Sequence, residues 1–357
     1  MNAGRTSATT REHRLIEAAR GKDNDAFRRL VEPYGAELHA HCYRMLGSVH
    51  DADDALQDAL LRAWRGLAKF EGRSSFRSWL YRIATNTCLD LISRRPKRVL
   101  PLEHGPAADP DDGPGEPIIE SVWVEPYADQ QLGLEDGYAS PEARYERRES
   151  VELAFIVALQ HLPATQRAVL ILREVLGFSA REVADTLETT VASVNGALRR
   201  ARKAVTETLP GQSQQATLRA LGDDGLQRIV ERYIDAWERG DVDAILAMLA
   251  EDATFAMPPL PTWYHGRDEI AIFLTRFALR DQWRLVPARA NGQLAFGAYA
   301  WDAEQGSYTA LSLDVLTLEG AQVTDITSFV TPATRGPARE RFAADVFQRF
   351  GMPDRLD

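Results

Sequence analysis

The chain has 357 residues, of which 45% are hydrophobic and 8% aromatic, and this composition excludes a wholly disordered or collagen-like protein. Its length predicts two or three domains. Against 42 lysines and arginines stand 52 aspartates and glutamates, and the net charge of −10, taken over the whole chain, argues against a nucleic-acid partner.

The charge is distributed unevenly along the chain. Residues 1–100 carry 18 basic and 12 acidic side chains, whereas residues 101–150 carry 3 basic and 13 acidic ones. Residues 151–209 hold 7 basic against 6 acidic side chains, and residues 210–357 hold 14 against 21. The acidity therefore lies in one short segment and in the C-terminal third, and the first hundred residues form a basic unit that suits nucleic acid.

The only cysteines, Cys42 and Cys88, belong to no motif with metal-ligand spacing. We therefore expect no disulfide framework, no structural metal and no cofactor. The N-terminus lacks the apolar region of a signal peptide, and no run approaches the roughly 18 apolar residues of a membrane span. These features predict a cytoplasmic protein with reduced thiols and no membrane partner.

Apolar residues recur at helical spacing from residue 11 to residue 98, which predicts an all-helical bundle. Two blocks within it, residues 51–64 (DADDALQDALLRAW) and residues 70–95 (FEGRSSFRSWLYRIATNTCLDLISRR), resemble region 2 of a sigma-70-family sigma factor of the extracytoplasmic-function group. The resemblance implies that the first block grips the clamp helices of bacterial core RNA polymerase. It also implies that the second block recognises and melts the −10 promoter element.

Both blocks have side chains suited to these roles. The first carries an acidic and polar stripe, opposite its apolar face, that offers charge-assisted contacts to a basic partner. Its candidate polymerase-binding residues are Asp53, Asp54, Gln57 and Asp58. Strand separation needs a pocket for an unstacked base and cations along the displaced backbone. The candidate −10 DNA residues in the second block are Arg73, Ser74, Phe76, Arg77, Arg82 and Asn86, whereas Trp79 and Ile83 are expected in the core.

Residues 99–149 are acidic, rich in proline and glycine, and without helical or strand periodicity, so we interpret them as an extended linker. In the family this linker threads the polymerase cleft, where negative charge imitates nucleic acid, although a solvated tether has the same composition. An apolar island at residues 118–127 has two interpretations. It is either a strip that packs on a neighbouring domain or a docking element for a partner groove.

Residues 150–209 have the layout of a helix-turn-helix, in which a short helix and a turn precede a longer helix with a basic end. Ser179 and Glu182 form the pattern of a capping box at the start of the short helix. The segment resembles sigma region 4, which reads the −35 element and contacts the polymerase flap. The candidate −35 DNA residues are Ser193, Asn195, Gly196, Arg199, Arg200 and Arg202.

The recognition helix departs from the family pattern. Where many relatives carry a lysine or arginine, then serine, then arginine, this chain has Asn195, Gly196 and Ala197. Asparagine can contact adenine with two hydrogen bonds, and the loss of two cations lowers the salt dependence of binding. The glycine costs about 1 kcal/mol of helix propensity, which a close backbone approach to DNA would offset. We therefore expect a weaker and altered −35 preference.

Residues 222–332 show two amphipathic helical stripes, then strands at 253–257, 282–290, 293–301, 307–318 and 321–330, with a helix at 267–279. This order predicts an α+β cone and resembles the SnoaL-like, nuclear transport factor 2-like fold. Such cones hold a pocket, so an unidentified small ligand is a candidate partner. The candidate lining residues are Trp237, Trp263, Tyr264, His265, Tyr299 and Asp314. We assign no catalytic residue, because no acid–base pair can be placed.

Residues 333–357 form a tail in which apolar side chains at helical spacing either close the cone or dock between the sigma domains. The expected fold is multidomain, with two all-α sigma domains followed by an α+β SnoaL-like cone. The expected function is that of a sigma factor, not an enzyme, with the cone regulating it in cis. One rival is a SnoaL-like isomerase or hydrolase fused to DNA-binding domains. Another is a polymerase-independent repressor, which leaves the region 2 resemblance unexplained.

Overall fold

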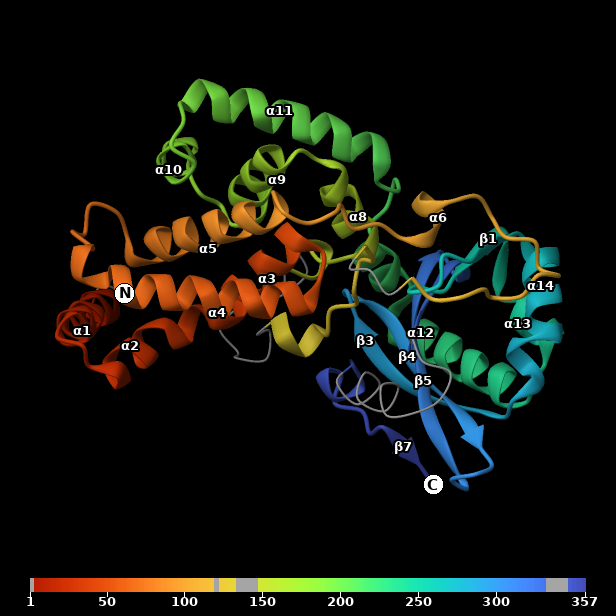
Figure 1. Ribbon diagram of the computed structural model, residues 1–357. Coiled ribbons are helices and arrows are strands. Elements are labelled where there is room, and N and C mark those ends of the chain that lie inside the picture. The colour runs from red at the N-terminus through yellow and green to blue at the C-terminus, as the bar shows by residue number, and fades with distance from the viewer. Residues whose placement is uncertain (1–2, 119–121, 133–146, 332–345) are drawn as a thin grey trace. The chain divides into compact units, whose positions relative to one another are not determined.

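The computed structural model of the chain describes residues 3–118, 122–132, 147–331 and 346–357 (Figure 1). The chain divides into two compact units, which we describe separately. The first unit comprises Met1–Pro96, Gln131–Gly133 and Ala158–Thr208, and the second comprises Lys97–Gln130, Leu134–Val157 and Leu209–Asp357.

The N-terminal part of the first unit is helical, as predicted. Its helices are α1 (Ala3–Arg20), α2 (Asn24–Val31), α3 (Gly35–Leu46), α4 (Val49–Gly66) and α5 (Phe76–Ile92). Hydroxyl side chains cap the last two, because Ser48 accepts the Asp51 N–H at 3.1 Å and Ser75 accepts the Ser78 N–H at 3.0 Å. These caps satisfy amide groups that the helix itself leaves unpaired, and so fix where α4 and α5 begin.

Helix α3 lies at the centre of this bundle and is buried along most of its length. His41 on α3 is fully buried, and its Nε2 lies 2.9 Å from the Thr85 hydroxyl of α5. Burial, together with the nearby charges of Arg44 and Arg77, lowers the pKa of His41 to about 3. This histidine is therefore neutral at physiological pH and serves as a core hydrogen-bonding group.

The remainder of the first unit forms the predicted helix-turn-helix. Its elements are the end of α8 (Leu153–His161), α9 (Ala164–Leu170), the π-helical turn η4 (Ile171–Val175), α10 (Ala180–Thr186) and α11 (Val191–Thr208). The capping box is present, because Ser179 accepts the Glu182 N–H and Glu182 accepts the Ser179 N–H. Arg167 of α9 is buried and donates to the carbonyl oxygens of Met45, Gln160 and Leu162. That set of bonds ties α9 to the end of α3.

The second unit contains the predicted α+β domain. Helices α12 (Gln214–Glu238), α13 (Val242–Leu246) and α14 (Arg267–Arg276) pack on one sheet of order β2-β1-β6-β5-β4-β3, with β7 paired to β5. The strands are β1 (Leu249–Ala256), β2 (Trp263–His265), β3 (Trp283–Ala290), β4 (Gln293–Asp302), β5 (Ser307–Glu319), β6 (Gln322–Val330) and β7 (Arg355–Leu356). Pairing is parallel between β1 and β6 and antiparallel elsewhere. The short strands β2 and β7 were not predicted.

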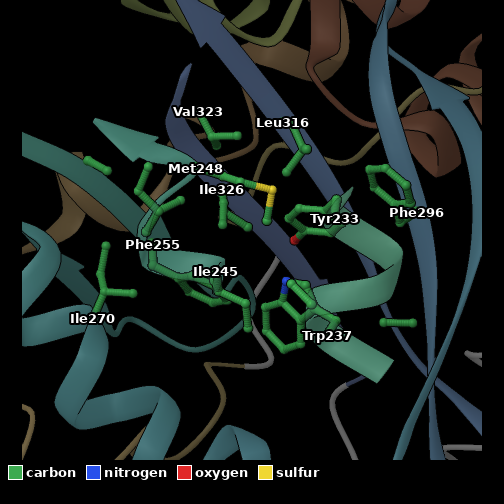
Figure 2. Close-up of a cluster of buried hydrophobic side chains, with 14 of the residues drawn as sticks. Tyr233, Trp237, Ile245, Met248, Phe255, Ile270, Phe296, Leu316, Val323 and Ile326 are labelled. Carbon is green, nitrogen blue, oxygen red and sulfur yellow. The ribbon is translucent and has the colours of Figure 1, made fainter. Parts of the chain in front are cut away.

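One face of this sheet meets the helices in a dense apolar core (Figure 2). Tyr233 of α12 stacks on Phe296 of β4 with ring centroids 4.5 Å apart, and Trp237 lies one helical turn further on. Inside α12 the backbone leaves helical geometry at Gly222, with φ 64° and ψ 173°. The amphipathic stripe of α12 that packs on the sheet follows this break.

The described part of the C-terminal tail covers the opposite face of the sheet. Phe347 is fully buried and packs edge-on against Tyr299 of β4, with centroids 5.1 Å apart. A Cβ atom on Gly297 would lie 2.6 Å from the Met352 sulfur, so only glycine permits this approach. The tail therefore adds a layer behind the sheet, although residues 342–345 of the predicted helix lie outside the described residues.

In the ranges that the structure describes, no helix is long and apolar enough to span a membrane.

Candidate nucleic-acid and polymerase interface

The polar stripe on α4 is formed as predicted. Its four candidates, Asp53, Asp54, Gln57 and Asp58, are exposed, and the alanines at 52, 55 and 59 are buried on the other side. Asp53 lies 3.0 Å from the Nε2 atom of His39, and Asp58 lies 2.9 Å from Arg62. The stripe thus presents carboxylates to solvent in the N-terminal half of α4, and its role in polymerase binding stays a prediction.

Phe76 was wrongly predicted as a −10 DNA residue. It is the first residue of α5, directly after the Ser75 cap, and only 2% of its surface is exposed. Its ring packs against Phe70 at 5.8 Å and Trp79 at 5.7 Å between centroids. The capped first turn directs this aromatic ring into the bundle, whereas Arg73 and Ser74, in the preceding turn, are exposed.

A pocket of about 380 Å³ lies between α4 and α5. It is lined by Arg62, Gly66, Lys69, Trp79, Ile83 and Asn86. Trp79 and Ile83, which were expected in the core, are half-buried: both line this pocket, and Trp79 also packs on Phe70. The sequence did not indicate that Arg62 and Lys69 line this pocket, since they precede the second block and approach α5 only when the helices pack.

Two of the predicted −10 cations are engaged by the helix-turn-helix within the first unit. The Arg77 guanidinium lies 4.8 Å from the ring centre of Phe178, and Arg82 forms a 2.7 Å ion pair with Glu188. The Ser78 hydroxyl donates to Glu182 at 3.3 Å. We call this set the α5–α10 contact. In this arrangement the two arginines are paired inside the chain.

The candidate −35 residues lie along α11. Thr190 caps this helix by accepting the Ser193 N–H at 3.1 Å, and its hydroxyl donates to the Ser193 hydroxyl at 3.0 Å. Asn195, Arg199, Arg200 and Arg202 are exposed, and Arg202 forms a 2.8 Å ion pair with Glu174. A Cβ atom on Gly196 would meet only an Arg200 nitrogen at 3.5 Å, so packing within the chain does not require glycine there.

The six candidate pocket residues of the second unit do not converge on one site. Trp237, Tyr264 and Asp314 are buried, whereas His265 is exposed. Tyr299 lies on the opposite face of the sheet and donates to the Pro353 carbonyl oxygen at 2.7 Å. Trp263 is half-buried at the margin of the domain, in β2. The prediction of one pocket lined by all six is therefore wrong, because alternate strand residues point to opposite faces.

Asp314 is held inside the domain core. It accepts hydrogen bonds from Ser328 at 2.6 Å and Ser312 at 2.9 Å, and burial raises its pKa to about 6 despite these bonds. The described residues include no cluster of three or more potential metal ligands.

The linker lies on the α+β domain, within the second unit. The Ala108 N–H donates to the Trp263 carbonyl oxygen at 2.9 Å, and the Trp263 indole donates to the Gly105 carbonyl oxygen at 3.0 Å. Further on, the Ile118 N–H donates to the Pro259 carbonyl oxygen at 2.9 Å. These bonds attach the acidic part of the linker to the β1–β2 connection and β2.

A second attachment is made by Asn291, in the turn between β3 and β4. Its Oδ1 accepts the Tyr127 N–H at 2.8 Å, its own N–H donates to the Tyr127 carbonyl oxygen at 2.8 Å, and its Nδ2 donates to the Val151 carbonyl oxygen at 2.7 Å. Val124 and Tyr127 of the apolar island are buried. The described part of the island thus packs on a neighbouring domain, the first of its two interpretations, and residues 119–121 lie outside the described residues.

We call the two attachments together the linker seat, formed by residues 259–263 and Asn291.

Comparison with known proteins agrees with this architecture. The family model "Sigma-70 region 2" matches residues 30–98, "Sigma-70, region 4" matches residues 152–205, and "SnoaL-like domain" matches residues 230–326. Together these matches cover both helical parts and the α+β domain.

Known sigma factors match either most of the chain or about half of it. The ECF RNA polymerase sigma factor SigG of Mycobacterium tuberculosis is 38% identical over 333 residues, covering 91% of this chain and 84% of that protein. SigW of Bacillus subtilis is 30% identical over 197 residues, covering 54% of this chain and 94% of that protein. The solved structure of Mycobacterium tuberculosis SigJ covers 83% of this chain and 94% of its own, with a TM-score of 0.53 at 21% identity. The chain belongs to the extracytoplasmic-function group of RNA polymerase sigma factors and carries a SnoaL-like domain at its C-terminal end.

Proposed function

We propose that this sigma factor, which directs core RNA polymerase to promoters, is regulated in cis by its SnoaL-like domain. The observation that carries the proposal is the linker seat. In related sigma factors the segment between regions 2 and 4 threads the polymerase cleft. A linker bound to the SnoaL-like domain is unavailable for that path until its bonds to residues 259–263 and Asn291 open.

The physical basis of the seat is mainly hydrogen bonding and apolar burial, and one exposed ion pair, between Asp111 of the linker and Arg276 of α14, adds to it. Residues 101–150 carry a net charge of −10 and residues 210–357 carry −7, so the two segments repel each other overall. The bonds at Trp263, Pro259 and Asn291 use main-chain groups or neutral side chains, each contributing about 0.5–1.5 kcal/mol. Such a seat is strong enough to hold the linker and weak enough for polymerase to displace it.

Release of the linker is expected to raise promoter-directed transcription. Asn291→Gly keeps the left-handed backbone, φ 55°, but removes the side-chain bonds to Tyr127 and Val151. We expect faster amide exchange at residues 122–128 and roughly 5- to 30-fold more run-off transcript, since losing two buried bonds costs about 1–2 kcal/mol. Purified core polymerase and a cognate promoter supply the assay.

The matched control is Asp302→Gly, at the end of β4 that is remote from Asn291. Asp302 accepts the Glu304 and Gln305 N–H groups there, away from the linker. This variant should transcribe like the native chain. Faster exchange of the linker in Asn291→Gly with unchanged transcript would refute regulation through the seat. Deletion of residues 210–357 should also change output, and an unaltered level would remove any regulatory role for the domain.

We propose no catalytic role for the SnoaL-like domain. Its single histidine, His265, is exposed, whereas Asp314 is buried and bonded to two serines. An acid–base pair requires both groups within reach of one substrate atom. Substrate turnover that disappears in both His265→Gln and Asp314→Asn would support the rival enzyme and contradict this assignment.

The sigma domains are proposed to act through the surfaces described above. The α4 stripe binds the clamp helices of core polymerase, region 4 contacts the flap, and the pocket beside Trp79 captures an unstacked base of the −10 element. The pocket supports base capture because it combines an aromatic ring, the Asn86 amide and two cations, Arg62 and Lys69. Because its partner polymerase works in the cytoplasm, we place the protein there.

Asn195 is proposed to set the −35 preference. Asn195→Arg should tighten promoter binding by holoenzyme and steepen the plot of log affinity against log salt by about one, since it adds one phosphate or guanine contact. Filter binding or fluorescence anisotropy across a salt series measures both. The control Thr206→Arg adds the same charge at the exposed far end of α11. If Asn195→Arg has the same salt slope as the native chain and selects the same promoters, that result would count against the assignment.

A further inference from the structure

Two adjoining hollows lie where three remote parts of the second unit meet. Their volumes are about 420 Å³ and 400 Å³, within the range of small-molecule sites. Both are lined by Asp129 at the end of the linker, Arg148 ahead of α8, and Arg289 at the end of β3. Helix α12 contributes Gln215, Arg219 and the acidic Asp223 to the second hollow. We call the combined site the arginine pocket, and Leu218 and Leu226, at the margin of the apolar core, also line its second hollow.

Positive charge exceeds negative charge among the residues shared by the two hollows. Asp129 is the carboxylate that faces both Arg148 and Arg289. One of its oxygens accepts the Gly292 N–H at 2.8 Å, and the other lies 3.7 Å from Arg148 Nε, too far for a hydrogen bond. Two guanidinium groups therefore share one carboxylate that is already bonded to the main chain.

The arginines retain donor capacity within this site. Arg148 Nε is buried and makes no hydrogen bond to any described residue. Arg289 is exposed and opens onto the hollow, and partial desolvation of its guanidinium, with the charge of Arg148 nearby, lowers its pKa. An anion placed between the two groups would accept their N–H donors and remove their mutual repulsion.

We propose that the arginine pocket binds a small phosphorylated compound through Arg148 and Arg289, with Arg219 at its margin. A phosphate dianion balances two guanidinium groups and accepts paired hydrogen bonds from each, because its oxygens match the arginine fork. The volume accommodates a phosphate group and an attached organic moiety of modest size.

Ligand binding in this pocket would also strengthen the linker seat. Asp129 lies two residues after Tyr127, whose backbone is bonded to Asn291, and Ala128 forms a β-bridge with Ala290 next to Arg289. A ligand held by Arg148 and Arg289 therefore fastens the linker end to the β3–β4 turn. This regulatory consequence rests on the proposed function, whereas ligand binding itself does not.

Calorimetry on the full chain tests the binding step, with inorganic phosphate, adenosine monophosphate and glucose 6-phosphate as probes and citrate as a carboxylate comparison. We expect a phosphate-bearing probe to bind, and Arg148→Gln together with Arg289→Gln to weaken it at least tenfold. Binding of the esters but not of free phosphate identifies an organic phosphate as the ligand; equal binding of both identifies the phosphate group alone. Arg289→Lys keeps the charge and loses the fork, so an intermediate affinity supports bidentate recognition.

Arg280→Gln is the control, because this exposed arginine contacts Phe277 away from the pocket. Absence of binding by every phosphate probe at about 10 mM, tighter binding of citrate, or undiminished binding by the double variant overturns the site. The double variant must retain the native circular dichroism spectrum; if it does not, the affinity of Arg289→Lys replaces it as the test, and native affinity in that variant overturns the site. Binding that leaves amide exchange at residues 122–128 unchanged refutes only the regulatory consequence. Unchanged transcript from the Asn291→Gly variant refutes only the proposed function.

Discussion

Replacing Asp54 and Asp58 with lysine is expected to weaken binding to core RNA polymerase by more than about 100-fold, since each charge-assisted contact contributes roughly 1.5–3 kcal/mol. Both carboxylates are exposed and one helical turn apart on α4, with Gln57 between them. Lysine also introduces like-charge repulsion against a basic partner surface. The native fold should persist, because Arg62 keeps its second ion pair, with Asp90 at 3.0 Å, when Asp58 is lost.

Competition for core polymerase against a fluorescent sigma factor measures this effect. Asp25→Lys is the matched control, because Asp25 is an exposed carboxylate on α2 whose ion pair with Arg28 is also exposed. We expect this control to compete like the native chain. Native affinity in the double variant, or an equal loss in the control, would show that the α4 stripe does not bind polymerase.

Truncation of Trp79 to alanine should reduce open promoter complexes by roughly 5- to 150-fold, because stacking of a base on an aromatic ring contributes about 1–3 kcal/mol. Trp79 lines the pocket between α4 and α5, where Asn86 and two cations converge. Assembly of holoenzyme should be unchanged, since the α4 stripe faces away from the core. Permanganate reactivity of −10 thymines reports strand opening.

Trp79 also packs on Phe70, with centroids 5.0 Å apart, so two further variants separate function from folding. Trp79→Phe should keep most of the activity, and Asn86→Ala should lose activity without disturbing the aromatic cluster. Leu91→Ala, a half-buried position further along α5, is the control. If Asn86→Ala and Leu91→Ala open promoters equally well, the pocket is not the site of base capture.

Local patterns allowed much of the fold to be predicted from the sequence. Helical periodicity indicated the bundle and the exposed stripe at Asp54 and Asp58, and the spacing of Ser179 and Glu182 indicated the start of α10. The alternation of apolar and polar residues indicated the long strands of the α+β domain. Phe76 was misassigned because an aromatic residue beside cations resembles a base-stacking platform, and only its packing on Phe70 shows that it faces inward.

The seat of the linker could not be predicted, for a physical reason. Its bonds join main-chain atoms of Gly105, Ala108 and Ile118 to a domain about 150 residues further along the chain. Main-chain donors and acceptors are the same in every residue except proline, so they leave no periodic signal. The arginine pocket was missed similarly, because Arg148 and Arg289 become neighbours only when the second unit folds.

The α5–α10 contact has a consequence for how strongly the free chain can hold DNA. Arg82 is paired with Glu188, and Arg77 with Phe178, so the helix that we propose reads the −10 element and the motif that we propose reads the −35 element are bound to each other. While α5 and the helix-turn-helix are joined in this way, the chain binds DNA as a single site. A partner that holds them apart makes the chain bivalent, and bivalency alone raises avidity by about 10²–10⁴-fold when the spacing matches. The affinity for a promoter then depends on the distance between its two elements as well as on their sequences.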